Sequence, residues 1–518
     1  MTNGRLLWVD DEIDLLKPYM IFLRGKGYDV STASNGTDAI DLCRESDFDL
    51  ILLDENMPGL SGLETLAGIK EIRPAVPVVM VTKNEAEDLM NQAIGAKIAD
   101  YLIKPVHPNQ ILLALKKNIH RREIVSEVAE SAYRREFAQI GMQISDSLTP
   151  EEWIELYKKL VHWELELAET GGPMADMLRM QKEEANQNFA KYIRNHYEEW
   201  FTPDAERPLI SPDVMKRVVF PRLNAGKRVR LFVLDNFRFD QWRVLAEELK
   251  NDFDIDEDLY FSILPTATQY ARNALFAGMM PADIRKNFPS LWVEEEDEEG
   301  KNLFEEEMVR QLLQRYRRKE SFTYHKINGA ADADRLLGAQ SQLAAARLNI
   351  IVVNFIDILS HARTESRMVR ELAGNEAAFR GVTRSWFLHS AISDIFRMPT
   401  PPDTETIVTT DHGSIRTTTP CKVVGDRNVN TNLRYKLGTN LGYNRREVYE
   451  VKQPARIGLP APNLSTTYIF ATGDRFFAYP NNYNHYVQYY KDTFQHGGIS
   501  MEEMIIPLVT LRPKVDRN

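Results

Sequence analysis

Residues 406–413 read TIVTTDHG, a run of β-branched side chains followed by an aspartate, a histidine and a glycine. β-branched residues favour extended backbone, so we expect a strand that ends at Asp411. A carboxylate and an imidazole side by side at the end of a strand belong either to an ordinary polar turn or to half of a metal site. The choice between these interpretations depends on whether further ligands follow other strands.

Other candidate ligands follow apolar strands of the same region. The segment RVRLFVLD ends at Asp235, and NIIVVNFID ends at Asp357. His361 comes four residues after Asp357 and would share a face with it if a helical turn follows the strand. The segment FQHGG places His496 in a turn near the C-terminus. Their joint occurrence favours a metal site, with these candidate ligands: Asp235, Asp357, His361, Asp411, His412 and His496.

This ligand set also indicates which ions it would hold. Mixed aspartate and histidine ligands suit Zn²⁺ first and Mn²⁺ second. Six ligands are too many for one tetrahedral ion but suit two ions that share a bridging group. The segment LPTATQYARNALFAG, residues 264–278, places Thr268 after a strand and before an apparent helix. Because a metal lowers the pKa of a bound hydroxyl and a helix N-terminus favours anions, Thr268 is the candidate nucleophile.

A second group of polar residues at predicted strand ends lies in the N-terminal region. Short apolar strands alternate there with amphipathic helices, which predicts a doubly wound parallel α/β sheet. Asp10, Asp11 and Asp54 should meet at one edge, where clustered carboxylates require a hard divalent ion such as Mg²⁺. Asp54 could then act as a nucleophile toward a phosphoryl donor. Lys104 would neutralise the added charge, and the Thr82 hydroxyl would bond a phosphoryl oxygen.

The chain of 518 residues is too long for one hydrophobic core, and its patterning predicts a multidomain protein. We expect an α/β domain over residues 1–120, an all-α helical connector over 121–207 and a larger α/β domain over 208–518. The connector contains a helix start in which Thr149 and Glu152 form a capping box.

Composition excludes several classes of protein. There is no run of about 18 apolar residues, so we expect no membrane insertion. The N-terminus lacks the pattern of a signal peptide, and only two cysteines occur, so we expect a cytoplasmic location. The net charge of −11 argues against a general nucleic-acid coat. The acidic run at 294–299 is either a solvated loop or an acidic docking surface.

The segments VDDE, LLDENMPGLSG, VT and IKP stand in the order and spacing of a known domain. They resemble the receiver domain of two-component response regulators, which implies a cognate sensor histidine kinase. By this resemblance Asp54 is the phosphoacceptor, and Asp11 and the carbonyl of Asn56 are Mg²⁺ ligands with Asp10 close by. The family's switch positions and its cis peptide correspond to Thr82, Tyr101 and Lys104-Pro105.

The region from residue 208 to 518 is similar to the PglZ branch of the alkaline phosphatase superfamily. It keeps the order of an aspartate, a hydroxyl nucleophile, a D-x-x-x-H motif, a D-H-G motif and a late histidine. The resemblance implies two Zn²⁺ ions and a phosphothreonine mechanism. It assigns one ion to Asp235, Thr268, Asp411 and His412, and the other to Asp357, His361 and His496.

The resemblance also concerns the residues that bind the phosphoryl oxygens. Phosphodiesterases of the superfamily have a glycine ten residues after the nucleophile, where Gly278 stands. They also have an asparagine soon after the nucleophile, where this chain has Ala271. Because Arg272 and Asn273 come next, we expect that binding of the phosphoryl oxygen is rebuilt around these two residues.

Further substrate contacts are open to two interpretations. Residues 422–438 include Arg434 and Lys436 and form either a loop around a polyanion or a solvated hairpin. The segment YPNNYNHYVQYY adds His485 and several tyrosines, which could stack on bases or pack internally.

Across the whole chain, the three parts resemble the response regulators tied to the type IX secretion system. From this resemblance we expect a phosphodiesterase of nucleotides or oligonucleotides that is controlled by phosphorylation of Asp54. Homodimer formation through the receiver or the connector is the expected switch, because few devices other than self-association link a receiver to a distant site. The main alternative is a non-catalytic adaptor that binds a sigma factor or secretion components. A phosphomonoesterase or sulfatase is the third possibility. Thr268 separates the first two, because a structural metal site needs no hydroxyl nucleophile.

Overall fold

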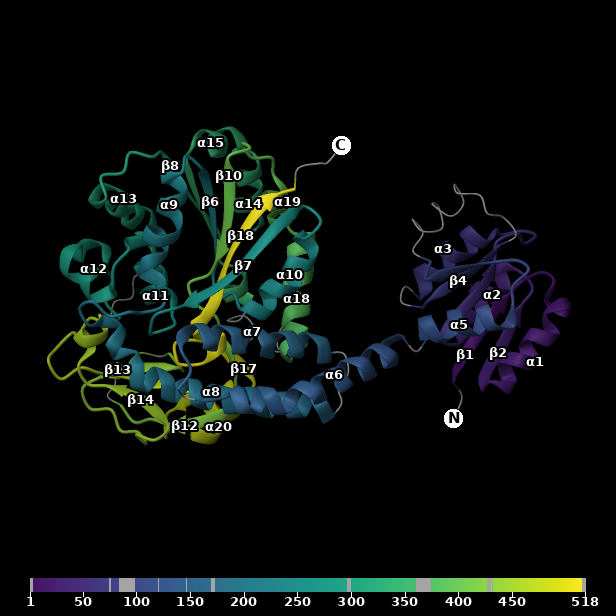
Figure 1. Cartoon of the computed structure of the whole chain (residues 1–518), viewed down its shortest axis with the longest axis horizontal. Helices are drawn as coiled ribbons and strands as arrows, with labels where there is room; N and C mark the ends of the chain where they lie inside the picture. Colours follow the sequence, from purple (N-terminus) through teal and green to yellow (C-terminus); the bar gives the residue numbers. More distant parts are fainter. Residues whose placement is uncertain are drawn as a thin grey trace. The chain divides into compact units, whose positions relative to one another are not determined.

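The computed structural model describes residues 3–514 apart from 74–75, 83–97, 120, 146, 169–172, 296–299, 360–373, 426–429 and 431. The chain divides into two units, and the division falls between Tyr133 and Arg134, within the long helix α6 (Arg121–Gln143) (Figure 1). Most of the expected helical connector is therefore part of the same unit as the larger α/β domain.

The first unit contains a parallel five-stranded sheet with the order β2-β1-β3-β4-β5. Alternate residues of β1 contribute to the two faces of the sheet. Leu6 and Trp8 pack in the cluster that also contains residues of α1 and α5, whereas Leu7 and Val9 pack in the cluster with α2 and α3. This is the doubly wound α/β fold that the sequence predicts. The elements are β1 (Gly4–Val9), α1 (Lys17–Gly25), β2 (Tyr28–Ala33), α2 (Gly36–Glu45), β3 (Leu50–Asp54), α3 (Gly62–Ile72), β4 (Val78–Thr82), β5 (Asp100–Ile103) and α5 (Pro108–Ile119).

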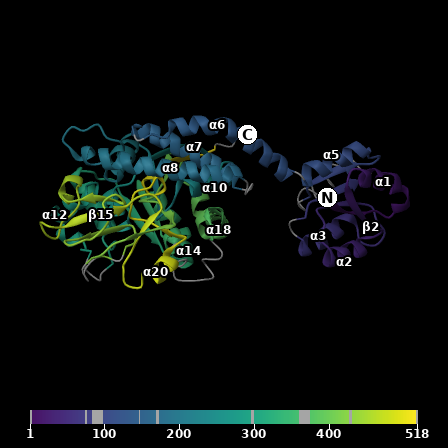
Figure 2. The ribbon, with the colours of Figure 1, turned by 90° about the horizontal axis from the view of Figure 1, so that it is seen from below.

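Two connector helices, α7 (Pro150–Leu167) and α8 (Pro173–His196), lie side by side in the second unit (Figures 1 and 2). The capping box is present: the Thr149 hydroxyl accepts from the backbone N–H of Glu152, and the Glu152 carboxylate accepts from the N–H of Thr149. The aromatic side chains of α7 and α8 pack inward, with Trp153 edge-on to Phe189 at 5.2 Å between ring centroids. The sequence therefore predicts this helix start correctly.

The second unit is built on a mixed six-stranded sheet. Five strands point in the same direction, and β18 runs antiparallel between β10 and β7. The central strands β6 and β9 are almost continuously buried, as expected for strands that are covered on both faces. In sheet order the strands are β7 (Phe253–Phe261), β18 (Ile505–Pro513), β10 (Thr404–Thr409), β6 (Arg228–Leu234), β9 (Leu348–Val353) and β8 (Phe322–Ile327).

Helices cover both sides of this sheet, with α10 and α18 on one side and α11 and α13 on the other (Figure 1). The helices of this unit are α9 (Phe220–Asn224), α10 (Phe239–Leu249), α11 (Thr268–Ala277), α12 (Pro281–Asn287), α13 (Glu305–Arg315), α14 (Ala330–Leu337), α15 (Gln340–Ala345), α18 (Glu376–His389), α19 (Ala391–Arg397), α20 (Tyr483–Tyr490) and α21 (Met501–Met504).

Three small sheets lie beside the main one. They consist of β11 (Ile415–Thr417) with β17 (Thr493–Gln495), β12 (Thr419–Lys422) with β16 (Arg475–Ala478), and β13 (Tyr435–Gly438) with β15 (Thr467–Ala471) and β14 (Val448–Val451). Within the described residues, no helix combines the length and the apolar character that a membrane span requires.

Candidate active site and receiver site

Three predicted acidic ligands of the first unit lie together at the carboxyl ends of β1 and β3. Ligand oxygens of Asp10, Asp11 and Asp54 are all within 4.8 Å of one another. They meet because β1 and β3 are neighbours in register, with Val9 opposite Leu53. Asp10 and Asp54 are buried and Asp11 is exposed. The sequence prediction that these carboxylates share one edge of the sheet is confirmed.

Lys104 provides the positive charge beside these carboxylates. Its Nζ lies 2.8 Å from Asp10 Oδ2 and 3.0 Å from Asp54 Oδ1. Burial raises the pKa of Asp54, and the ammonium group of Lys104 opposes that shift. The peptide between Lys104 and Pro105 is cis. Lys104 therefore pairs with both buried carboxylates of this cluster, and its assigned role beside a phosphorylated Asp54 stays a prediction.

The remaining receiver positions lie around this group. The Thr82 hydroxyl donates to Glu55 Oε2 at 2.5 Å, and Glu55 directly follows Asp54. Tyr101 is 39% exposed on β5. Asn56 belongs to the turn that follows β3. The assigned roles of Thr82, Tyr101 and Asn56 stay predictions.

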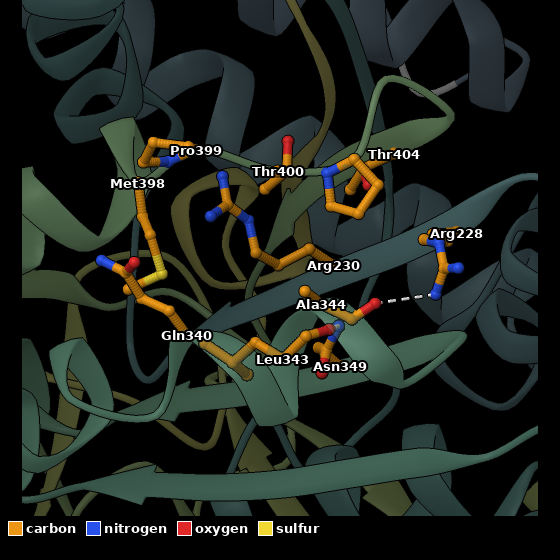
Figure 3. A pocket seen from close by; sticks show the side chains of 11 residues that line it. Arg228, Arg230, Gln340, Leu343, Ala344, Asn349, Met398, Pro399, Thr400 and Thr404 are labelled. Carbon is orange, nitrogen blue, oxygen red and sulfur yellow. Dashed lines mark hydrogen bonds between the residues drawn. The ribbon is translucent and has the colours of Figure 1, made fainter.

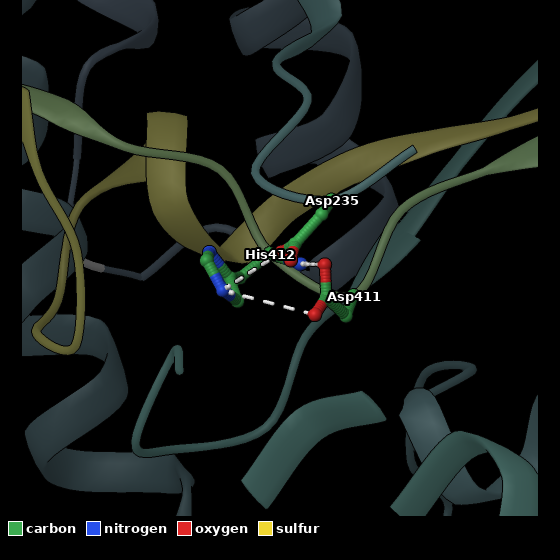
Figure 4. Close-up of side chains that lie close together, drawn as sticks. All are labelled: Asp235, Asp411 and His412. Atoms are coloured by element: carbon green, nitrogen blue, oxygen red, sulfur yellow. Dashed lines mark hydrogen bonds and ion pairs between the residues drawn. The ribbon is translucent and has the colours of Figure 1, made fainter. Parts of the chain in front are cut away.

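The second unit brings Asp235, Asp411 and His412 together, although the first is far from the other two in sequence. Asp235 follows β6 and Asp411 follows β10, and these strands are parallel neighbours with Val233 opposite Thr409. One ligand atom of each side chain lies within 4.8 Å of the others. All three are buried and point toward one another (Figure 4). The site lies at the carboxyl ends of the strands, where α/β sheets bind ligands.

Thr268 joins this group from the first residue of α11. Its Oγ1 lies 3.1 Å from His412 Nε2 and donates to Asp235 Oδ1 at 3.3 Å. The free N–H groups and the dipole at the start of α11 favour negative charge there. A hydroxyl oxygen therefore lies between two of the candidate metal ligands.

Asp357 and His496 form a second group next to the first. His496 Nε2 lies 3.7 Å from Asp357 Oδ1, and the His496 ring stacks on the His412 ring with 4.2 Å between centroids. The Asn236 side chain donates to Asp357 Oδ1 at 3.3 Å. His361, the remaining predicted ligand, lies outside the described residues. All the candidate ligands that lie within the described residues are therefore close to one another.

Both histidines are oriented by backbone carbonyl groups. His412 Nδ1 lies 3.0 Å from the carbonyl oxygen of Gly413, and His496 Nδ1 lies 3.0 Å from that of Thr266. Because a carbonyl oxygen only accepts, each Nδ1 carries a proton, and in the neutral ring Nε2 then keeps its lone pair. Burial also lowers the pKa of His412, which favours the neutral ring. Histidines that ligate metals are commonly fixed in this way.

The charges of the second unit's site fit a bound cation. The pKa of Asp235 is raised to about 8, because burial and the neighbouring carboxylates raise it more than Arg272 lowers it. Asp411 is completely buried, and its Oδ2 has no hydrogen-bond partner among the described residues. Buried carboxylates need cations or protons. An orphaned carboxylate oxygen beside an imidazole lone pair suits a divalent metal.

Arg272 and Asn273 follow Thr268 on α11. Arg272 is 2% exposed, and its Nη1 lies 2.8 Å from Asp235 Oδ2 while its Nε lies 2.5 Å from Glu305 Oε1. Asn273 is fully buried and donates to the carbonyl oxygen of Lys301 at 3.2 Å. Arg272 therefore borders the candidate metal ligands, whereas Asn273 is linked to the site only indirectly, because Asn302 Nδ2 donates both to Asn273 Oδ1 and to the carbonyl oxygen of Thr268. Gly278 ends the helix with a φ of +61°.

The three other predicted substrate contacts are Arg434, Lys436 and His485. Arg434 is fully buried and pairs with Glu503 at 2.6 Å. Its guanidinium has no exposed surface, so it contacts an internal carboxylate and not the expected substrate anion. Lys436 is 1% exposed, and burial lowers its pKa to about 7. His485 lies on α20, where its ring stacks with that of Tyr489.

Glu503 is a residue of this site that the sequence predictions missed. Its Oε1 accepts from the N–H of Gly498 at 2.9 Å, and its backbone carbonyl accepts from the N–H of Gly413 at 3.1 Å. It therefore binds the loops that carry His412 and His496. The signal was the pair Ser500 and Glu503, since Ser500 Oγ accepts from the N–H of Glu503 as a helix N-cap.

A small pocket at the opposite ends of the strands is separate from this site (Figure 3). Arg230 donates to the carbonyl oxygens of Ile395 and Phe396 at 3.0 and 2.8 Å and so caps the last turn of α19. Burial lowers the pKa of Arg230 to about 10. Its bonds identify Arg230 as a structural residue.

Family models match nearly the whole chain. Residues 6–116 match the response regulator receiver domain, so the first unit is a receiver. Residues 214–511 match the BREX system PglZ alkaline phosphatase-like domain, and this chain belongs to that family. Residues 123–201 match the PorX response regulator linker domain, so the order of the three domains is that of a PorX-type response regulator. A receiver implies a sensor kinase as partner, and the PglZ domain is of a hydrolase superfamily.

Individual relatives match a smaller part of the chain. The chain is 38% identical over 143 residues to the transcriptional regulatory protein ZraR of Klebsiella oxytoca, covering 27% of this chain and 31% of that protein. It is 37% identical over 136 residues to the alginate biosynthesis transcriptional regulatory protein AlgB of Pseudomonas aeruginosa, covering 26% of this chain and 30% of that protein. The chain thus spans less than a third of the length of these curated relatives.

A solved structure is similar to a comparable part of the chain. It is a CheY-like response regulator receiver domain protein from Methanospirillum hungatei JF-1, with 28% identity and a TM-score of 0.22, and the match covers 23% of this chain and 95% of that one.

Proposed function

We propose that the PglZ domain is a zinc-dependent phosphodiesterase with Thr268 as its nucleophile. The position of the Thr268 hydroxyl, 3.1 Å from His412 Nε2 and 3.3 Å from Asp235 Oδ1, carries this proposal. A structural metal site would have no use for a hydroxyl at the start of a helix. Nucleotides or oligonucleotides are the proposed substrates, and the PorX linker match supports a role in type IX secretion.

The proposed reaction follows from the arrangement of these side chains. Asp235, Asp411 and His412 would hold one ion, and Asp357 and His496 a second. Bound zinc supplies Lewis-acid chemistry: it lowers the pKa of the Thr268 hydroxyl, polarises the phosphoryl group and activates water. With its proton released to solvent, Thr268 Oγ bonds to phosphorus as the bond to the leaving alcohol breaks. Water then cleaves the phosphothreonine, which restores the hydroxyl and releases the phosphate monoester.

Removal of metal tests the requirement for a cation. Dialysis against a chelator is expected to reduce hydrolysis of bis(p-nitrophenyl) phosphate to background, because the Thr268 hydroxyl would lose the cation that lowers its pKa. Added Zn²⁺ should restore the rate, with Mn²⁺ as the comparison. Full activity in protein that elemental analysis shows to be free of transition metals would contradict the proposal. A panel with p-nitrophenyl phosphate and sulfate in parallel distinguishes the monoesterase and sulfatase alternatives.

Phosphorylation of Asp54 is proposed to control the effector through a homodimer. Incubation with acetyl phosphate is expected to add one phosphoryl group and double the mass measured by light scattering, because the ammonium of Lys104, 3.0 Å from Asp54 Oδ1, can neutralise the new charge. The Asp54→Asn variant should show neither change. An unchanged mass in phosphorylated wild-type protein would remove the dimer from this account. Binding of a sigma factor or secretion component in place of catalysis is the alternative role.

A further inference from the structure

The single turn α21 lies against both loops that carry candidate histidine ligands. The N–H of Gly413 donates to the carbonyl oxygen of Glu503 at 3.1 Å, and the N–H of Gly498 donates to Glu503 Oε1 at 2.9 Å. Contact with Gly413 is so close that a Cβ there would lie 2.0 Å from the carbonyl oxygen of Glu502. Because Gly413 directly follows His412, a shift of α21 would displace this ligand.

The connector helix α8 holds α21 through the side chains of Asn186, which is buried, and Lys182, which is 17% exposed. Asn186 Oδ1 accepts from the N–H of Met501 at 2.8 Å, and Asn186 Nδ2 donates to Glu502 Oε2 at 2.9 Å. Lys182 Nζ lies 3.2 Å from the other oxygen, Glu502 Oε1. Asn186 is 5% exposed and Glu502 is 6% exposed. Both oxygens of the Glu502 carboxylate are therefore bound by α8.

A chain of ion pairs, partly exposed at Lys182 and Glu164 and buried beyond them, extends the same contact to the Asp235 loop. Lys182 pairs with Glu164 on α7, and Glu164 pairs with Arg380 on α18 at 2.7 Å. Arg380 pairs with Asp240 at 3.0 Å, and Asp240 pairs with Arg238 at 2.5 Å. Arg238 stands three residues after the candidate ligand that follows β6, and it also packs beside the D-H-G motif. Connector and ligand loops thus share one set of paired charges.

The connector also reaches the segment that precedes the nucleophile. Tyr197 OH accepts from the N–H of Leu264 at 2.8 Å, four residues before Thr268. The connector is therefore bonded to α21 and to the segment leading into α11.

We propose that Asn186 and Lys182 are positioning residues for the metal site: through Glu502 they fix α21, and α21 fixes the loops of His412 and His496. This inference rests on the proposed function in one respect, because it takes His412 and His496 to be metal ligands. In this arrangement α8 packs behind the metal site. A change in the position of the connector would therefore be transmitted to the effector through α8.

An exchange of the amide and the carboxylate tests this inference in the full chain. Asn186→Asp sets a carboxylate against Glu502. Glu502→Gln leaves one acceptor oxygen for the two donors Asn186 Nδ2 and Lys182 Nζ, so each single change removes one bond between α8 and residue 502. Together the two changes restore it with donor and acceptor reversed, and the total charge is unchanged. Polar partners that orient metal ligands typically alter affinity by 10- to 100-fold.

The readout is the visible absorption spectrum of Co²⁺ added to metal-free protein, together with the Kd of its binding. The His412→Ala variant, which lacks one candidate ligand, gives the background. We expect each single variant to change the spectrum and to raise the Kd by roughly 10- to 100-fold. The double variant should recover both. Arg194→Met is the matched control, because it removes a connector bond to the carbonyl oxygen of Val448, 2.9 Å long, that does not involve α21. It should leave the cobalt spectrum unchanged.

Each outcome separates this inference from the proposed function. A wild-type cobalt spectrum and affinity in Asn186→Asp, or an equal change in Arg194→Met, would overturn the positioning role and leave the phosphodiesterase proposal intact. Cobalt binding that follows the expected pattern in a protein without hydrolase activity would support the inference and contradict the enzyme. No cobalt binding to wild-type protein would overturn both.

Discussion

Replacement of Thr268 by alanine is expected to lower kcat for an aryl phosphodiester by roughly 10⁴-fold or more, because the proposed reaction loses its nucleophile. Zinc content should fall only in part, since Asp235, Asp411 and His412 remain. The rate of bis(p-nitrophenyl) phosphate hydrolysis and the zinc content of the same preparation, by elemental analysis, measure the two effects.

The matched control for this variant is Thr268→Ser. Serine keeps the hydroxyl at the start of α11 and loses only the methyl group, so substantial activity should remain. Mass spectrometry of acid-quenched reactions is expected to find a phosphoryl group on residue 268 in wild-type protein. Full activity of Thr268→Ala would refute the covalent mechanism and favour the adaptor alternative.

The second large effect is expected for Gly413→Ala. A Cβ at this position would lie 2.0 Å from the carbonyl oxygen of Glu502, and that atom belongs to the backbone and cannot rotate away. The resulting shift should separate His412 from Asp235 and lower the free energy of unfolding by about 3 kcal/mol. Urea unfolding and cobalt titration measure these two consequences.

Gly381→Ala provides the comparison for this substitution. Gly381 lies inside α18, is exposed, and has no atom within 4 Å of the Cβ position. Alanine is a better helix former, so this variant should gain about 0.5–1 kcal/mol without a change in metal binding. A Gly413→Ala protein as stable and as active as Gly381→Ala would contradict the packing described for the D-H-G loop.

Much of the fold follows from local sequence patterns. Alternating apolar strands and amphipathic helices predict the receiver sheet, and Thr149 with Glu152 predicts the start of α7. The residues at strand ends also predict which side chains lie close together in the folded chain. Asp235 and Asp411 meet because their strands are parallel neighbours, and this consequence of sheet topology is visible in the sequence as two apolar runs that each end in an aspartate.

Other features depend on packing between distant segments and leave little local trace. Arg434 reads as an exposed cation in a polar loop, yet it is buried against Glu503, 69 residues further along the chain. Asn186 lies in the middle of a helix with many charged residues, and the sequence around it does not indicate its role. Its hydrogen bonds to Met501 and Glu502 show that it binds α21. The connector therefore reads as a separate bundle in sequence, although α7 and α8 pack within the effector unit.

Anomalous X-ray diffraction at the zinc edge, from crystals grown with zinc, is the most direct measurement for this account. A peak is expected among the carboxylates of Asp235 and Asp411, the Nε2 of His412 and the hydroxyl of Thr268, with a second beside Asp357 and His496. No peak at these positions, or a threonine oxygen beyond bonding reach of the nearest one, would contradict the claim that these groups converge on a catalytic metal.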